Sequence, residues 1–258
     1  MPAALSPFYR SPGRDFTLVL GDCLEALAAF DFRFDLVFAD PPYFLSDGGV
    51  SVQSGRRVCV DKGAWDRPPG RDAERAFTLA WLRAVRGKLT PQGTLWVCGT
   101  YHNSFLVADC LEALGFRLLN AVTWVKTNPP PNLSCRMLTH ASEVILWARR
   151  HPRVPHRYNY ALLRAIAGGR QMRDVWPLPA LRPWEKVGGV KHPTQKPLSL
   201  LVRILLAATA PHDWVLDPFC GSGTAGVAAN LLGRRFLGVD RCADYLRLAQ
   251  ARREALDA

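Results

Sequence analysis

Residues 214–240 have the sequence WVLDPFCGSGTAGVAANLLGRRFLGVD, and the fold class follows from this stretch. Its apolar residues predict a short buried strand at 214–216, a helix at 224–232 and a second strand at 236–239. Between the first strand and the helix, Gly221, Gly223 and Gly226 satisfy the spacing G-x-G-x-x-G. This order of elements is typical of a doubly wound α/β fold, in which ligands bind at the carboxyl ends of the strands.

The glycine-rich turn fits two classes of adenosyl ligand. Asp240 ends the second strand nineteen residues after Gly221, where an acid that binds ribose hydroxyls is expected. The pattern therefore admits a nicotinamide dehydrogenase. Asp217 favours another ligand, because a carboxylate beside the turn would repel a pyrophosphate and attract the α-ammonium group of an amino acid. S-adenosylmethionine carries such a group, and we expect it as the cofactor.

A second motif, Asp40-Pro41-Pro42-Tyr43, ends an apolar run at residues 34–39 that predicts a buried strand. The two prolines keep the segment extended and leave the Pro41 carbonyl available to accept a hydrogen bond. Together with the Asp40 carboxylate, this carbonyl could hold both hydrogens of an exocyclic amino group on a nucleobase. Such a base must first leave the duplex, and stacking on Tyr43 would offset part of that cost. The alternative is a turn that merely ends the strand.

Helices alternate with strands along the rest of the chain, which predicts a parallel doubly wound sheet. Asp22 follows the first strand with Glu25 three residues later, which is the spacing of a capping box. The Asp22 carboxylate either caps a helix or faces a ligand, and the two roles are compatible. The remaining predicted strands are residues 16–20, 94–98, 118–126 and 143–148, and the remaining helices are residues 73–85, 102–114, 197–209 and 243–258.

Composition limits the compartment and the chemistry. The net charge of +11 and the pI near 9.7 indicate a polyanionic partner, either nucleic acid or an acidic membrane surface. No run of 18 apolar residues occurs, so we expect a soluble, cytoplasmic protein. The seven cysteines form no Cys-x-x-Cys pair, and neither disulfides nor a metal are expected. No Pro-Cys dipeptide supplies the thiol nucleophile of enzymes that methylate a ring carbon of cytosine.

Two segments carry the candidate contacts to DNA. Residues 46–66 are polar and glycine-rich, and we interpret them as an irregular flap over the site. Residues 149–191 contain ten Lys or Arg against two acids, a net charge of +8, with interleaved aromatic residues. A solvated charged face is the alternative, but this concentration favours a nucleic-acid contact module. The candidate DNA-contacting residues are Arg56, Arg57, Arg157, Arg170, Arg173 and Arg182.

The two motifs together resemble the beta group of DNA amino-methyltransferases, in which the catalytic tetrapeptide precedes the cofactor loop. The sequence HPTQKP at residues 192–197 also resembles that group. The resemblance implies a Rossmann-like, mostly parallel seven-stranded sheet with a small basic target-recognition insert. It divides the chain into a catalytic part at 1–148, the insert at 149–191 and a cofactor-binding part at 192–258.

The resemblance also implies roles for individual residues. Asp40, Pro41, Pro42 and Tyr43 would hold the target base. The cofactor S-adenosylmethionine, converted to S-adenosylhomocysteine, would contact Asp22, Cys23, His192, Lys196, Asp217, Phe219, Cys220, Gly221, Ser222, Gly223, Thr224 and Asp240.

The expected activity is methylation of adenine N6 on a flipped base in duplex DNA, because residues 43–49 resemble a subset that acts on adenine. The alternatives are N4-cytosine methylation, methylation of RNA or of a protein glutamine, an NAD-binding enzyme, and a nucleic-acid binder without catalysis. A cognate restriction endonuclease is a candidate partner, and a monomer or homodimer is expected.

Overall fold

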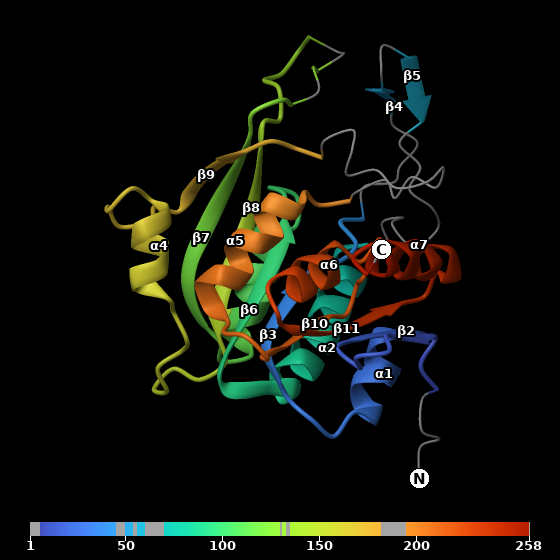
Figure 1. Ribbon diagram of the computed structural model, residues 1–258. Helices are drawn as coiled ribbons and strands as arrows, with labels where there is room; N and C mark the ends of the chain where they lie inside the picture. Colours follow the sequence, from blue (N-terminus) through green and yellow to red (C-terminus); the bar gives the residue numbers. More distant parts are fainter. Residues whose placement is uncertain are drawn as a thin grey trace.

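The unit predicted from residues 214–240 lies in the middle of the sheet. The computed structural model describes residues 6–44, 50–53, 56–59, 70–129, 131–132, 135–181 and 195–257. Strand β10 (Trp214–Asp217) leads through the glycine-rich loop into helix α6 (Thr224–Leu231), which returns the chain to strand β11 (Arg235–Asp240). Strands β10 and β11 pair in parallel, with Asp217 opposite Gly238. The carboxyl ends of both strands therefore meet at one edge of the sheet (Figure 1).

The main sheet of the described chain has nine strands, and the five in its middle are parallel. These five are flanked by antiparallel pairings of β1 with β2, of β6 with β8 and of β8 with β7. In spatial order the strands are β1 (Tyr9–Arg10), β2 (Phe16–Leu20), β11, β10, β3 (Phe34–Ala39), β6 (Leu89–Gly99), β8 (Ser142–Arg149), β7 (Arg117–Lys126) and β9 (Val175–Leu178).

The sheet has two strands more than the expected seven, because short segments add to both of its edges. Strand β1 has two residues, and strand β9 comes from the basic segment 149–191 and pairs in parallel with β7. Pro177 lies within β9. An edge strand tolerates proline because its outer side needs no N–H for a neighbouring strand.

Two further expectations are corrected. The strict alternation of helix and strand ends after helix α3 (Ser104–Ala113), because β7 and β8 follow one another as an antiparallel hairpin. Within the segment expected to be an irregular flap, β4 (Val50–Gln53) and β5 (Arg56–Cys59) form a two-stranded antiparallel sheet. The remainder of the flap lies outside the described residues.

Each face of the main sheet buries its own apolar core, as a doubly wound fold requires. Helices α1 (Cys23–Ala29), α2 (Arg71–Lys88) and α3 supply one core. Helices α4 (Tyr160–Ile166), α5 (Leu198–Ala208), α6 and α7 (Ala243–Glu254) supply the other. In the part of the chain that the structure describes, no helix combines the length and apolarity needed to cross a membrane.

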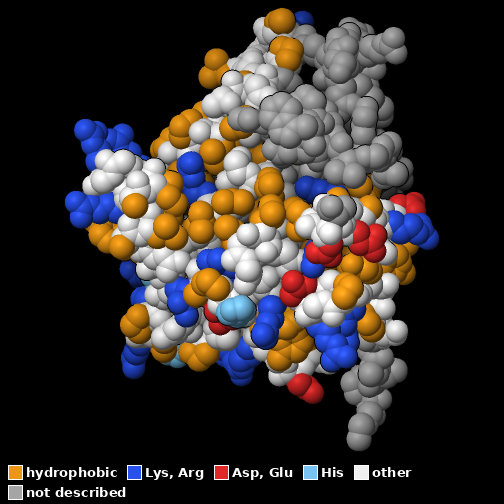
Figure 2. All heavy atoms as spheres, in the orientation of Figure 1, with side chains coloured by type: hydrophobic (Ala, Val, Ile, Leu, Met, Phe, Trp, Pro, Cys, Tyr) orange, Lys and Arg blue, Asp and Glu red, His pale blue; other side chains and the backbone are white. Residues whose placement is uncertain are grey.

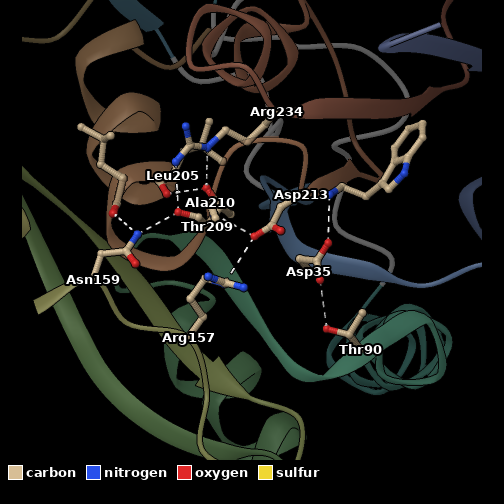
Figure 3. Close-up of polar contacts among 11 residues, drawn as sticks. Asp35, Thr90, Arg157, Asn159, Leu205, Thr209, Ala210, Asp213 and Arg234 are labelled. Carbon is tan, nitrogen blue, oxygen red and sulfur yellow. Dashed lines mark hydrogen bonds and ion pairs between the residues drawn. The ribbon is translucent and has the colours of Figure 1, made fainter.

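Polar contacts join the first part of segment 149–191 to the amino ends of the parallel strands (Figure 3). Arg157 Nε lies 3.5 Å from the Asp213 carboxylate, directly before β10. The Asn159 side chain donates to the carbonyls of Leu206 and Thr209, at 2.8 and 2.7 Å. These contacts fix Arg157 and Asn159 at the edge of the sheet opposite to the carboxyl ends of β3, β10 and β11.

Candidate functional site

A cavity of about 710 Å³ opens at the carboxyl ends of β3, β10 and β11. This volume is typical of a site for a cofactor-sized ligand. The structure thus brings together residues that are far apart in the sequence, such as Asp22 and Asp240. Among the predicted site residues, the cavity is lined by Asp22, Cys23, Asp40, Pro41, Pro42, Tyr43, Lys196, Asp217, Phe219, Cys220, Gly221, Ser222, Thr224 and Asp240.

Two glycines shape the cofactor loop without lining the cavity. Gly223 has φ +72°, and a methyl group on it would lie 2.6 Å from Ala249 Cβ. Gly226 faces the rings of Phe16 and Phe236, and a methyl group on it would lie 2.5 Å from Phe236 Cδ1. The positive φ and the nearby α7 therefore require glycine at position 223, and the close approach of α6 to the sheet requires it at position 226. Behind the loop, Arg252 donates to the Ser222 carbonyl at 2.7 Å and to Thr224 Oγ1 at 2.8 Å.

Asp240 connects the cofactor loop to the turn after β11. Its Oδ2 accepts from Gly221 N–H at 2.7 Å, and its Oδ1 accepts from Cys242 N–H at 2.8 Å. Burial raises the pKa of Asp240, while these backbone donors oppose the rise. The carboxylate is held rigidly at the cavity wall and keeps lone pairs for a further donor.

Asp217 is the most deeply buried carboxyl group of the cavity, with 3% of its surface exposed. Burial raises its pKa well above the ordinary value, the hydrogen bond from Phe219 N–H opposes this, and the charges of Asp40 and Asp240 raise it further. A cation placed beside Asp217 would reverse this shift, because it would favour the ionised carboxylate.

Asp22 acts as a helix cap, as the sequence predicted. Its Oδ1 accepts from Leu24 N–H at 2.7 Å and from Glu25 N–H at 3.2 Å, at the first turn of α1. Its Oδ2 pairs with Arg241, which also lines the cavity. The adjacent Cys23 is buried, and burial raises the pKa of its thiol to about 11. The thiol is therefore neutral at physiological pH and forms part of an apolar wall.

The motif at residues 40–43 folds back on itself at the end of β3. The Tyr43 hydroxyl donates to Asp40 Oδ1 at 2.7 Å, and Lys196 Nζ lies 2.9 Å from Asp40 Oδ2 and donates to the Tyr43 hydroxyl at 3.2 Å. The Lys196 ammonium also lies 5.3 Å from the centroid of the Tyr43 ring. Lys196, expected at the cofactor, lines the cavity and pairs there with Asp40.

A second acid completes this buried network. Lys196 Nζ lies 3.3 Å from Glu143 Oε2, and Lys126 Nζ lies 2.7 Å from Glu143 Oε1. Burial would lower the pKa of Lys196, but Asp40 and Glu143 together raise it. Burial would likewise raise the pKa of Glu143, but Lys196 and Lys126 lower it. Lys196 is 6% exposed, so its charge is compensated by carboxylates rather than by water.

Of the predicted DNA-contacting residues, the three with described side chains, Arg157, Arg170 and Arg173, do not line the cavity. Arg157 pairs with Asp213 at the opposite edge of the sheet, and this position does not support its predicted role in DNA contact. Arg170 and Arg173 are exposed in the connection from α4 to β9. Arg56 and Arg57 lie in β5, where only the backbone is described, and Arg182 and His192 lie outside the described residues.

Sequence reasoning missed three charged residues that shape the site. Glu143 is an acid within the apolar run of β8. Arg241 directly follows Asp240, the predicted ribose-binding acid. Arg252 lies on α7 and donates to the Ser222 carbonyl behind the cofactor loop. Only Glu143 gave a signal, because a charge inside a buried strand requires a partner. The partners of Arg241 and Arg252 depend on tertiary packing.

The comparisons with known proteins agree with this geometry. Residues 34–251 match the N6/N4 DNA methylase family. The chain belongs to this family. It is 43% identical to the type II methyltransferase M2.MboI of Moraxella bovis over 96% of this chain and 91% of that protein. It is 50% identical to the type II methyltransferase M2.DpnII of Streptococcus pneumoniae over 86% of this chain and 82% of that protein.

A solved structure extends the likeness to the fold of a protein in complex with SAM. The M1.HpyAVI–SAM complex has a TM-score of 0.70 and 26% identity, covering 92% of this chain and 98% of that chain. The protein with the present sequence is therefore an enzyme that transfers methyl groups from S-adenosylmethionine to amino groups of DNA bases. The α/β fold and the cofactor that the sequence predicted are confirmed.

Proposed function

We propose that this enzyme methylates adenine N6 at a specific sequence in duplex DNA, on a base turned out of the helix. The observation that carries the proposal is the meeting of Asp40 and Tyr43 with the glycine-rich loop in one cavity. Asp at position 40 favours adenine, because family members with Ser at this position mostly modify cytosine. The enzyme would act on chromosomal DNA in the cytoplasm and protect it from a cognate endonuclease.

The cavity fits S-adenosylmethionine on grounds of its own chemistry. The Asp217 carboxyl is buried, and an α-ammonium group would compensate its charge. Asp240 is held by two backbone donors with lone pairs left for ribose hydroxyls. Asp22 and Cys23, on the cavity wall, would contact the adenine ring, and the loop at residues 219–224 would contact the methionine part. When bound, the cofactor supplies an electrophilic methyl group on a sulfonium.

The base half of the cavity is set by Asp40 and Tyr43. The Tyr43 hydroxyl occupies the oxygen of Asp40 that an incoming amino group would need. We infer that the base displaces this hydroxyl, so that Asp40 and the Pro41 carbonyl hold the amine while the Tyr43 ring stacks on the base. Lys196 keeps the second Asp40 oxygen in position. The Asp40 charge then meets the positive charge that develops on the nitrogen.

Substitutions of Tyr43 separate stacking from hydrogen bonding. Tyr43→Phe keeps the ring and removes the hydroxyl that competes for Asp40, so kcat/KM for DNA methylation should stay within about threefold of the wild-type value. Tyr43→Ala removes the ring and should lower kcat/KM by about 10–100-fold, since stacking on an aromatic side chain contributes about 1–3 kcal/mol per base. Equal losses in the two variants would refute the stacking role.

The affinity for S-adenosylhomocysteine should depend on pH through Asp217. Its pKa is raised without ligand, and the ligand's ammonium favours the ionised form, so binding should strengthen as the pH rises through that pKa. Below it, the affinity should change by up to about tenfold per pH unit. Calorimetry between pH 5 and 7.5 measures this. The carboxylates of Asp40 and Asp240 also face the Asp217 carboxyl, so Asp217→Asn is the control. If the affinity of this variant for S-adenosylhomocysteine changed with pH as in the wild type, Asp217 would not be the group that binds the ammonium.

Sequencing that reads modified bases directly tests the proposal in cells. DNA from cells that express the enzyme should carry N6-methyladenine at one recognition sequence. The same host strain without the enzyme, chosen to lack this modification, is the control. Extracted DNA should then resist an endonuclease specific for that sequence. Scattered modification without a common sequence would contradict site-specific methylation.

A further inference from the structure

The hairpin of β7 and β8 extends past the rest of the sheet on the side of the cavity. Strand β6 ends its pairing with β8 at Gly99 and Val144, whereas β7 and β8 stay paired to Val125 and Ser142. Figure 1 shows the connection between them projecting beyond the neighbouring strands. The hairpin thus extends from the edge of the sheet where Asp40 lies.

Exposed apolar side chains lie on the described part of this connection, residues 135–140, which we call the hairpin tip. Leu138 is 90% exposed and Met137 is 60% exposed. Figure 2 shows hydrophobic side chains with a Lys or Arg side chain beside them at this end of the molecule. Exposure of two adjacent large apolar side chains to water is unfavourable, and such exposed apolar surface often marks a site of interaction.

The tip is connected both to the site and to the sheet. Glu143 lies at the base of the hairpin and contacts Lys196, which in turn contacts Asp40. The five residue-to-residue steps from Leu138 to Glu143 can span at most about 18 Å. The His140 ring stacks on Tyr101, directly beyond β6, with ring centroids 5.2 Å apart and planes at 21°. The apolar pair is therefore held at a limited distance from Asp40.

The charge around the tip matches a polyanion. Arg136 and His140 are exposed on either side of the apolar pair, and the protein as a whole carries a net charge of +11. Proteins that unstack DNA combine cations on the phosphates with an apolar side chain between bases. A membrane surface would also accept cations and apolar groups, but the target of the reaction is a base of duplex DNA.

We propose that the hairpin tip binds the duplex beside the target, with Leu138 filling the space that the extruded base leaves and Arg136 contacting phosphate. The proposal rests on the proposed extrusion of the base and holds for adenine or cytosine. Neighbouring bases lose stacking when one base leaves, and an apolar side chain in the gap replaces part of it. Met137 packs beside Leu138 against the groove.

Three variants test the proposed insertion of Leu138 into the duplex, which we call the wedge. The Tm of each variant is measured, so that a loss of activity through misfolding is recognised. Leu138→Ala should lower kcat/KM on unmodified plasmid DNA about tenfold, which corresponds to roughly 1.4 kcal/mol. Leu138→Met should restore most of the rate, and affinity for S-adenosylhomocysteine should be unchanged in both. Leu231→Ala is the control, because Leu231 is an exposed leucine at the end of α6, 53% exposed, away from the hairpin tip. A wild-type rate in Leu138→Ala, or equal losses in the Ala and Met variants, would overturn the wedge.

DNA binding gives a second measurement that does not depend on methylation. Arg136→Gln should reduce the slope of log Kd against log salt concentration by about 1, because one phosphate contact is lost. Leu138→Ala should leave that slope unchanged. An unchanged slope in Arg136→Gln would remove the tip from the DNA surface. Absence of methylation by the wild-type enzyme would instead count against the proposed function, and the salt slope would still test the hairpin.

Discussion

Asp40→Asn should lower the rate of methyl transfer to DNA by roughly 10³-fold or more while the enzyme still folds. The substitution keeps the volume of the side chain and removes the charge that faces the reacting nitrogen. Groups that stabilise developing charge in a buried site contribute about 10²–10³ in rate, and Asp40 also aligns the amine. Rapid-quench measurements with labelled S-adenosylmethionine give the rate of the chemical step.

The same variant should keep its affinity for S-adenosylhomocysteine within about tenfold, a change of roughly 1.4 kcal/mol, because the proposed cofactor contacts come chiefly from the ends of β10 and β11. Asp109→Asn on α3, which alters an exposed ion pair with Arg75 on α2, is the matched control and should leave the rate unchanged. An Asp40→Asn enzyme with more than a tenth of the wild-type rate would remove Asp40 from the reaction.

Gly226→Ala should destabilise the fold by about 1–3 kcal/mol, because the added methyl group would overlap the rings of Phe16 and Phe236. Both rings are fully buried, so neither can move without disturbing the core. For a chain of this length, Tm should fall by roughly 3–10 °C. Thermal unfolding followed by circular dichroism measures the change.

Gly87→Ala is the matched control with the opposite expected sign. Gly87 lies exposed in α2, and nothing lies within 4 Å of an added methyl group. The substitution should stabilise the protein by about 0.5–1 kcal/mol, since alanine favours a helix over glycine. If both variants were equally destabilised, close packing of α6 on the sheet would not explain the glycine at 226.

The sequence predicted the parts of the site whose chemistry is local. Three features depend on neighbouring residues alone: the glycine-rich turn between β10 and α6, the acid at the end of β11 and the double proline after β3. The structure has all three at one edge of the sheet. The helix cap at Asp22 is local as well, and its hydrogen bonds are present.

The contacts that the sequence did not predict depend on tertiary pairing. Lys196 lines the cavity, as expected, but its pairing with Asp40 after β3 and with Glu143 of β8 was not predicted. Nor did the sequence predict that Arg157 pairs with Asp213 at the far edge. The sequence shows that these residues are cationic but not which acid each will meet. The hairpin of β7 and β8 was missed as a functional element for the same reason, because its projection appears only in the assembled sheet.

Mass spectrometry of nucleosides tests the central claim most directly. Unmodified DNA is incubated with the enzyme and S-adenosylmethionine that carries a deuterated methyl group, then digested to nucleosides. The account predicts N6-methyladenine with the full isotopic shift, and none from the Asp40→Asn enzyme. Labelled N4-methylcytosine without labelled N6-methyladenine would contradict the adenine assignment, and label in neither nucleoside would contradict the proposed reaction.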